Sequence, residues 1–335
     1  MKLLTKLTLL LLLVACLPDF AAAKQRIKLT TLAPKGSSFH KSLQRMSSDW
    51  RKISGGQINI IIYPGGIQGG ESAMVERMAI NQTHAGLLSG TGLAEIEPSV
   101  KGLQIMPMMF NDLEEYDYVS EKIEPKLERM IRAKGFIVLF WTDVGFVRFF
   151  AKEPVLTPDD LKKLKLFTWS GDPKQASVMK SAGFNIVPLE TADILTSLQT
   201  GLIEAVPMPP FYALSGQVFG PAPHMLDLNW APLIGAAVIT EKSWNRIPDE
   251  FKDAFLESAK KTGIAIKAAG RRESYLAIKT MHEKWNLQVH PVDQKIVEEW
   301  RNMCRQIYPD LRGKIIPEDI FDEVESLVKE YRALP

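Results

Sequence analysis

Two hydrophobic periods alternate along the first half of the chain. Short runs rich in β-branched and aromatic residues predict strands at residues 26–32, 57–63, 85–89 and 136–141. Between the first two runs, the three- or four-residue spacing of one helix face is found at Phe39, Leu43, Met46, Trp50 and Ile53. Residues 73–79 predict a second helix, and residues 116–130 a third. Strands that alternate with helices indicate βαβ units and a largely parallel sheet.

A second region of the same kind begins near residue 148. Thr157 with Pro158 and two following acids is a strong helix start. The pattern then predicts strands at residues 165–168, 186–188 and 234–240 and a helix at 173–181, with Thr191 capping a further helix that stops at Gly201.

Residues 249–286 carry a helical pattern that no proline interrupts. About 38 residues at 1.5 Å each reach almost 60 Å, which exceeds the width of one domain. Such a helix braces two lobes along their backs unless Gly263 or Gly270 divides it. Residues 293–307 and 317–331 predict two closing helices. Because the sequence contains no flexible linker, we expect the lobes to be joined by crossing strands.

Residues 1–23 predict a secretory signal peptide, with a basic start, an apolar stretch and small residues at a cleavage site. The apolar stretch is shorter than the roughly 20 residues that span a bilayer. Leu13-Val14-Ala15-Cys16 also resembles a bacterial lipobox. Both processing routes stay open, so we expect a periplasmic protein that is either soluble or anchored by a lipid on Cys16.

Composition and motifs exclude several classes of binding site and catalytic site. Cys16 and Cys304 are the two cysteines, so we expect no disulfide in the mature chain. A formal net charge of +2 gives no indication of nucleic-acid binding. The five histidines show no zinc-site spacing, and no phosphate-binding loop, dinucleotide fingerprint or nucleophile elbow is present. We therefore predict no metal, no cofactor and no enzymatic activity.

A glycine-rich loop, residues 63–71, joins a predicted strand to a predicted helix. Its four glycines allow close approach of backbone to a ligand and leave helix N–H groups facing outward. A plain strand-to-helix turn explains the same composition.

Four further segments occur in a characteristic order with this loop. They are residues 33–37 (APKGS), 106–110 (MPMMF), 157–162 (TPDDLK) with Leu164-Lys165, and 198–201 (LQTG) followed by Glu204. In this order the chain resembles the solute-binding proteins of tripartite ATP-independent periplasmic (TRAP) transporters, of the dicarboxylate-binding type, over nearly its whole mature length.

The resemblance implies an α/β fold of the periplasmic-binding-protein kind, with two lobes whose hinge-joined sheets flank a ligand cleft and a long helix that spans both. Lobe I comprises residues 24–147, completed by about 236–265. Lobe II comprises residues 148–235, completed by about 266–300, and residues 301–335 form C-terminal helices packed on the lobes. The resemblance also implies that the protein's partners are a small-molecule ligand and the TRAP membrane permease subunits. The protein would contact the membrane only through the permease or through a lipid on Cys16.

Two positions depart from that family. Most members have an arginine that pairs with a substrate carboxylate where this chain has Phe167, and commonly an asparagine where it has Met208. Arg148 is the remaining candidate cation, although a hinge or surface salt bridge explains it equally well. Burying a ligand anion without a cationic partner is costly.

We therefore predict a cleft suited to a ligand with a large apolar portion and, if it is acidic, a carboxylate bound by Arg148. The predicted ligand-binding residues are Arg148, Phe167, Trp169, Met208, Phe211, Trp230, Glu71 and Ser89. Several of the apolar ones are equally compatible with a role in the core. The alternative function is an exported lipid-handling protein or enzyme that has kept the carrier fold.

Overall fold

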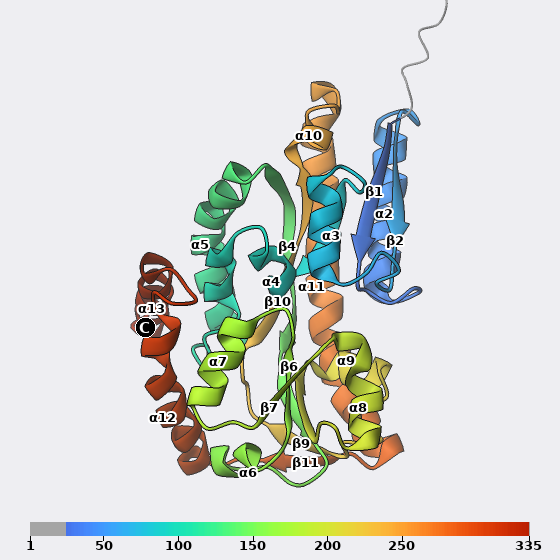
Figure 1. Ribbon diagram of the computed structural model, residues 1–335. Coiled ribbons are helices and arrows are strands. Elements are labelled where there is room, and N and C mark those ends of the chain that lie inside the picture. The colour runs from blue at the N-terminus through green and yellow to red at the C-terminus, as the bar shows by residue number, and fades with distance from the viewer. Residues whose placement is uncertain (1–24, 335) are drawn as a thin grey trace, which may run out of the picture.

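The computed structural model describes residues 25–334, so the predicted signal peptide and Cys16 lie outside the described residues. Two lobes, each built on its own sheet, lie one above the other in Figure 1, and the long helix α11 (Asp249–Trp285) runs beside both. It is one continuous helix of 37 residues, as predicted, and neither Gly263 nor Gly270 divides it. In the described part of the chain, no helix combines the length and apolar character needed to cross a membrane.

The sheet of lobe I has the strand order β2-β1-β3-β10-β4. These strands are β1 (Gln25–Thr31), β2 (Ile58–Tyr63), β3 (Ala85–Ser89), β10 (Pro232–Thr240) and β4 (Phe136–Phe146). The first three are parallel, but β10 runs antiparallel to both β3 and β4. The prediction of a largely parallel sheet is therefore wrong for this half, because β10 returns from the other lobe and enters from the opposite end.

The sheet of lobe II has the order β11-β9-β5-β8-β6-β7. Its strands are all short: β5 (Arg148–Ala151), β6 (Leu166–Trp169), β7 (Ile186–Leu189), β8 (Ala205–Met208), β9 (His224–Asp227) and β11 (Gln288–Pro291). Here β5 runs antiparallel to β8 and β9, while the remaining pairs are parallel.

Helices cover both sheets. Those of lobe I are α2 (Ser38–Ile53), α3 (Glu71–Ala79), α4 (Gly90–Ala94), η2 (Pro98–Leu103), α5 (Leu113–Ala133) and α10 (Glu241–Trp244). Those of lobe II are α6 (Pro158–Lys162), α7 (Pro173–Ser181), η3 (Thr191–Asp193), α8 (Ile194–Thr200) and α9 (Pro210–Ser215). The closing helices are α12 (Gln294–Leu311) and α13 (Glu318–Arg332).

Local sequence accounts for several helix ends. The Thr157 hydroxyl and the Asp160 carboxylate form a reciprocal capping box at the start of α6. Gly201 ends α8 in the left-handed conformation, with φ of 77°. The prediction that Thr191 caps this helix is wrong, because Thr191 begins the 3-10 turn η3 and α8 starts after Asp193.

The core of lobe I fills both faces of its sheet. On one face, Trp50 of α2 stacks on Phe255 of α11 with ring centroids 4.2 Å apart. Close approach of α11 to β4 requires a glycine, since a Cβ at Gly263 would lie 2.7 Å from the Cβ of Phe140. The other face packs against α5 and α13. Buried clusters also lie on the two faces of the lobe II sheet.

Two crossing segments join the lobes. The chain passes from β4 to β5 through Val147, and from β9 to β10 through residues 228–231. The segments are hydrogen-bonded to each other, because the Val147 N–H donates to the Ala231 carbonyl at 2.8 Å. Behind them, Arg271 of α11 donates to Asp143 on β4 and Asp117 on α5. The residue boundaries predicted for the lobes stay a prediction.

Candidate ligand site between the lobes

Strand direction decides which residues face the crevice. Because β4 leads directly into β5 and β9 into β10, the ends that meet are the carboxyl ends of β4 and β9 and the amino ends of β5 and β10. The parallel strands β1–β3 and β6–β8 also point their carboxyl ends at this junction. Ligands of open α/β sheets bind outside the carboxyl ends of the strands, so this junction is the candidate site.

Glu71 and Ser89 form a contact on the lobe I wall. Glu71 is the first residue of α3, directly after the glycine-rich loop, and Ser89 ends β3. The Ser89 N–H and hydroxyl donate to the Glu71 carboxylate at 2.6 and 2.5 Å. A Cβ at Gly92 would lie 2.9 Å from the Cβ of Glu71, so a glycine is needed there for α4 to pass this carboxylate.

Burial shifts the pKa values of Glu71 and Tyr212. Removal from water raises the pKa of Glu71, although the hydrogen bonds from Ser89 oppose that effect. The pKa of Tyr212, on α9 of lobe II, is raised to about 12 by burial and by the negative charge of Glu71. The charge of Glu71 on lobe I is therefore felt by Tyr212 on lobe II. Tyr212 was missed by the sequence reasoning, although it directly follows the predicted Phe211.

Phe167 and Trp169 lie on β6 and Met208 ends β8, in the half of lobe II that faces the junction. Phe167 and Met208 are half-buried and pack against the cluster of buried side chains that α8 and α11 cover. Trp169 ends β6, and its indole ring lies over Gly171, where an added Cβ would come within 2.1 Å of the ring. Glycine at position 171 therefore leaves room for the Trp169 ring beside the crevice.

Phe211 and Trp230 each pack against aromatic neighbours. Phe211 contacts Phe39 of lobe I edge to face, with ring centroids 5.4 Å apart, so it bridges the two lobes. Trp230 lies in the crossing segment before β10 and contacts Phe149 and Trp300 at 5.0 and 5.9 Å. Both side chains are half-buried. Their part in ligand binding stays a prediction.

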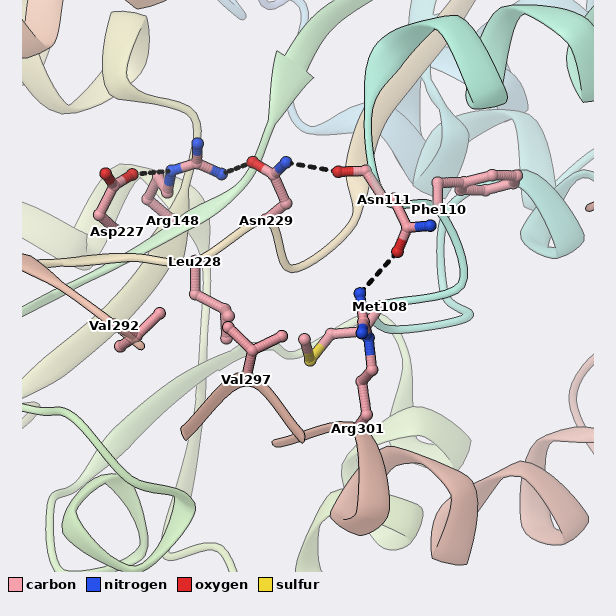
Figure 2. A pocket seen from close by; sticks show the side chains of 10 residues that line it. All are labelled: Met108, Phe110, Asn111, Arg148, Asp227, Leu228, Asn229, Val292, Val297 and Arg301. Carbon is pink, nitrogen blue, oxygen red and sulfur yellow. Dashed lines mark hydrogen bonds and ion pairs between the residues drawn. The ribbon is translucent and has the colours of Figure 1, made fainter. Parts of the chain in front are cut away.

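Arg148 lines a cavity of about 280 Å³ at one end of the crevice, together with Asp227, Asn229, Arg301 and six further residues: Met108, Phe110, Asn111, Leu228, Val292 and Val297. Figure 2 shows the Arg148 guanidinium between Asp227 and Asn229. It donates to the Asn229 side chain, and its Nε lies 3.3 Å from Asp227 Oδ1.

The charge of Arg148 is largely sequestered from water, since its side chain is 16% exposed. Burial lowers its pKa, while Asp227 opposes the shift. Its Nε makes no hydrogen bond with any described residue, because Asp227 is within ion-pair distance but poorly aligned. Asn229 in turn donates to the Asn111 carbonyl, and Arg301 donates to the Asn111 side chain at 2.7 Å. No sequence pattern marked these partners, because Asp227 ends β9, Arg301 lies on α12, and Asn111 and Asn229 lie in two separate connections.

Among the described residues, no cluster of three or more His, Cys, Asp or Glu side chains could hold a metal ion. His40 is buried and accepts the Gly36 N–H at 2.9 Å. Cys304 is a free, buried cysteine.

Residues 29–314 match the family model of bacterial extracellular solute-binding protein, family 7. The chain is 25% identical over 250 residues to the 2,3-diketo-L-gulonate-binding periplasmic protein YiaO of Escherichia coli, covering 72% of this chain and 74% of that one. It is 21% identical over 291 residues to the C4-dicarboxylate-binding periplasmic protein DctP of Rhodobacter capsulatus, covering 86% and 85%.

Solved structures share the fold. A sugar acid binding protein of Advenella mimigardefordensis in complex with galactonate superposes with a TM-score of 0.84 at 19% identity, covering 92% of this chain and 99% of that one. A TRAP periplasmic solute-binding protein of Sulfurospirillum deleyianum with bound succinate gives a TM-score of 0.81 at 19% identity, covering 91% and 99%. Together with the family match, these likenesses establish that the chain belongs to family 7 of the bacterial extracellular solute-binding proteins, the DctP family.

Proposed function

We propose that this protein binds a small organic acid with a substantial apolar portion, outside the cytoplasmic membrane, and delivers it to a TRAP-type secondary transporter. Family membership supports the carrier role. The observation that carries the ligand class is Arg148, a mostly buried guanidinium at the crevice edge whose Nε lacks a hydrogen-bond partner among the described residues. A ligand carboxylate would supply the acceptor that this nitrogen lacks.

The relatives support an acidic ligand. Their names or structures include 2,3-diketo-L-gulonate, C4-dicarboxylates, galactonate and succinate. In this chain Asp227 already offsets part of the charge of Arg148, and Lys101 is ion-paired with Asp172. One carboxylate is therefore easier to accommodate than two, since a second buried anion would need a cation of its own.

The apolar portion of the ligand is inferred from the lobe II wall. Phe167 and Met208 offer hydrocarbon and thioether surface, and Trp169 adds an aromatic face at the carboxyl end of β6. Glu71 of lobe I and Tyr212 of lobe II supply hydrogen-bonding groups for a hydroxyl. A hydroxylated or keto monocarboxylic acid with an aliphatic or aromatic body fits both walls.

The test is a calorimetric and thermal-unfolding screen of the purified protein against succinate, galactonate, glucuronate and aliphatic or aromatic hydroxy acids. A ligand at a hundredfold excess over its dissociation constant should stabilise the protein by about 2.7 kcal/mol. We expect the apolar hydroxy acids to bind best, and Arg148→Met to weaken binding at least about tenfold. Arg45→Met, on the exposed surface of α2, is the control.

Tighter binding of succinate than of every apolar acid would contradict the proposed ligand class but leave the carrier role intact. Chemical conversion of a bound acid would contradict the carrier role itself. Uptake of the identified acid by cells that carry the neighbouring permease genes, and its loss on deletion of this protein, tests the coupling to a TRAP transporter.

A further inference from the structure

We infer that Lys101 and Asp172 form a latch that stabilises the closed arrangement of the two lobes. The inference rests on the proposed function in one respect, namely that the lobes open and close around the crevice. Lys101 lies on η2 of lobe I, and Asp172 immediately precedes α7 of lobe II. Their side chains meet across the crevice, with Lys101 Nζ 2.5 Å from Asp172 Oδ2.

The carboxylate of Asp172 is oriented by its own helix, independently of Lys101. Asp172 is the N-cap of α7, and its Oδ1 accepts the N–H of Gln175 at 3.1 Å. This bond orients the carboxylate and leaves Oδ2 for Lys101. The N-cap role explains why an aspartate occurs at position 172. It does not explain why a lysine of the other lobe pairs with this aspartate.

The same helix makes apolar contact with lobe I. Val178 of α7 packs against the buried cluster that contains Met74, Leu88 and Leu103, all of lobe I. Nearby, a Cβ at Gly70 of the glycine-rich loop would lie 3.8 Å from Glu190 Oε2 of lobe II. The structure is therefore a closed state in which Lys101 and Asp172 are part of a wider contact between the lobes.

Burial makes this pair different from a surface ion pair. The side chains of Lys101 and Asp172 are only 16% and 7% exposed. In an open state both would be hydrated. In the closed state each charge loses most of its water and depends on the other, so removal of one partner leaves an uncompensated buried charge. Removal of both leaves no uncompensated charge, so the closed state should recover in part, and the remaining difference from wild type is the net contribution of the pair.

Comparing the two single variants with the double variant tests whether the ion pair stabilises the closed state. Lys101→Met and Asp172→Asn should each open the protein, whereas the double variant should lie closer to wild type than either single variant. Asparagine keeps the N-cap of α7, so Asp172→Asn removes the charge without removing the helix start. Lys163→Met is the matched control, because Lys163 pairs with Asp160 inside lobe II at 3.2 Å.

The experiment measures the distance between the lobes by pulsed electron paramagnetic resonance without added ligand. Spin labels are placed at Gln82→Cys on lobe I and Ser177→Cys on lobe II, both exposed, in a Cys16→Ser background; Cys304 is buried. We expect a mainly short distance in the wild type and in Lys163→Met. In Lys101→Met the ratio of short to long distances should fall by roughly tenfold or more, since an unpaired buried charge costs several kcal/mol.

The latch would be overturned by single variants as closed as the wild type, or by a double variant more open than either single variant. Circular dichroism and thermal unfolding confirm that each variant is folded. If the labelled wild type keeps one distance with and without galactonate, succinate and the apolar acids, although calorimetry detects binding, then the lobes do not move and the latch is refuted while binding stands. If no acid binds but Lys101→Met opens the protein, the proposed ligand class fails and the latch stands.

Discussion

Replacing Glu124 by glutamine should stabilise the protein in a strongly pH-dependent way. Glu124 lies on α5 and is partly exposed. Burial raises its pKa from 4.5 to about 8; nearby Lys267 opposes this shift, and the charges of Glu128, Glu121 and Asp117 add to it. Lys267 cannot compensate fully, because its ammonium group pairs with Asp117 at 2.6 Å.

The direction of the pH effect follows from the difference in proton binding between the folded and unfolded states. Between pH 4.5 and about 8 the folded state holds a proton on Glu124 that the unfolded state has lost. The contribution of this group to stability therefore falls as the pH rises through that interval, by up to about 1.4 kcal/mol for each pH unit. The full interval corresponds to about 5 kcal/mol as an upper limit. Because solvent reaches the side chain, we expect about 2–3 kcal/mol.

Urea unfolding followed by circular dichroism at pH 5 and pH 9 measures this effect. At pH 5, Glu124→Gln and the wild type should have nearly the same free energy of unfolding, since the glutamate is protonated in the fold. At pH 9 the variant should be the more stable by about 2–3 kcal/mol. Glu114→Gln, an exposed position on the same helix whose charge does not contribute to the shift at Glu124, is the control. A constant difference between Glu124→Gln and wild type across this range would refute the reasoning.

Three further predictions follow from packing and charge. Gly263→Ala should lower the free energy of unfolding by about 1–3 kcal/mol, because its Cβ would lie 2.7 Å from Phe140 Cβ; thermal unfolding tests this, and an unchanged melting temperature would contradict the packing. Arg271→Met should cost about 3–5 kcal/mol, since it strands the fully buried Asp143 carboxylate, and adding Asp143→Asn should recover part of the loss in a double-mutant cycle. Burial raises the pKa of the Cys304 thiol, so it should react with a thiol reagent only after denaturation, and rapid labelling of the native protein would contradict that.

Wherever a segment carries its own signal, the sequence was sufficient to predict its structure. The helix face of α2 repeats every three or four residues, and α11 has no proline over its whole length, so local periodicity alone predicts both. The capping box of α6 is likewise written in four consecutive residues. An ordered set of loop segments identified the family, although no single segment would have done so.

Four of the six short strands of lobe II escaped prediction, whereas β6 and β7 were predicted from apolar runs that precede helix signals. The strands β5, β8, β9 and β11 have four residues each, too few to establish an alternation of apolar and polar side chains. Their pairing is decided by the sheet that surrounds them. The antiparallel entry of β10 into the first sheet is also a property of the chain path, which no local pattern records.

The sequence therefore determined the class of protein, the long helix α11 and most other helices. The tertiary structure decided which side chains meet between the lobes. Predicted residues such as Arg148 could be named from the sequence, but their partners could not. Asp227 is 79 residues from Arg148, and Asp172 is 71 residues from Lys101. Contacts at such separations depend on how two sheets meet, and the strength of each charge there depends on how much water the closed lobes exclude.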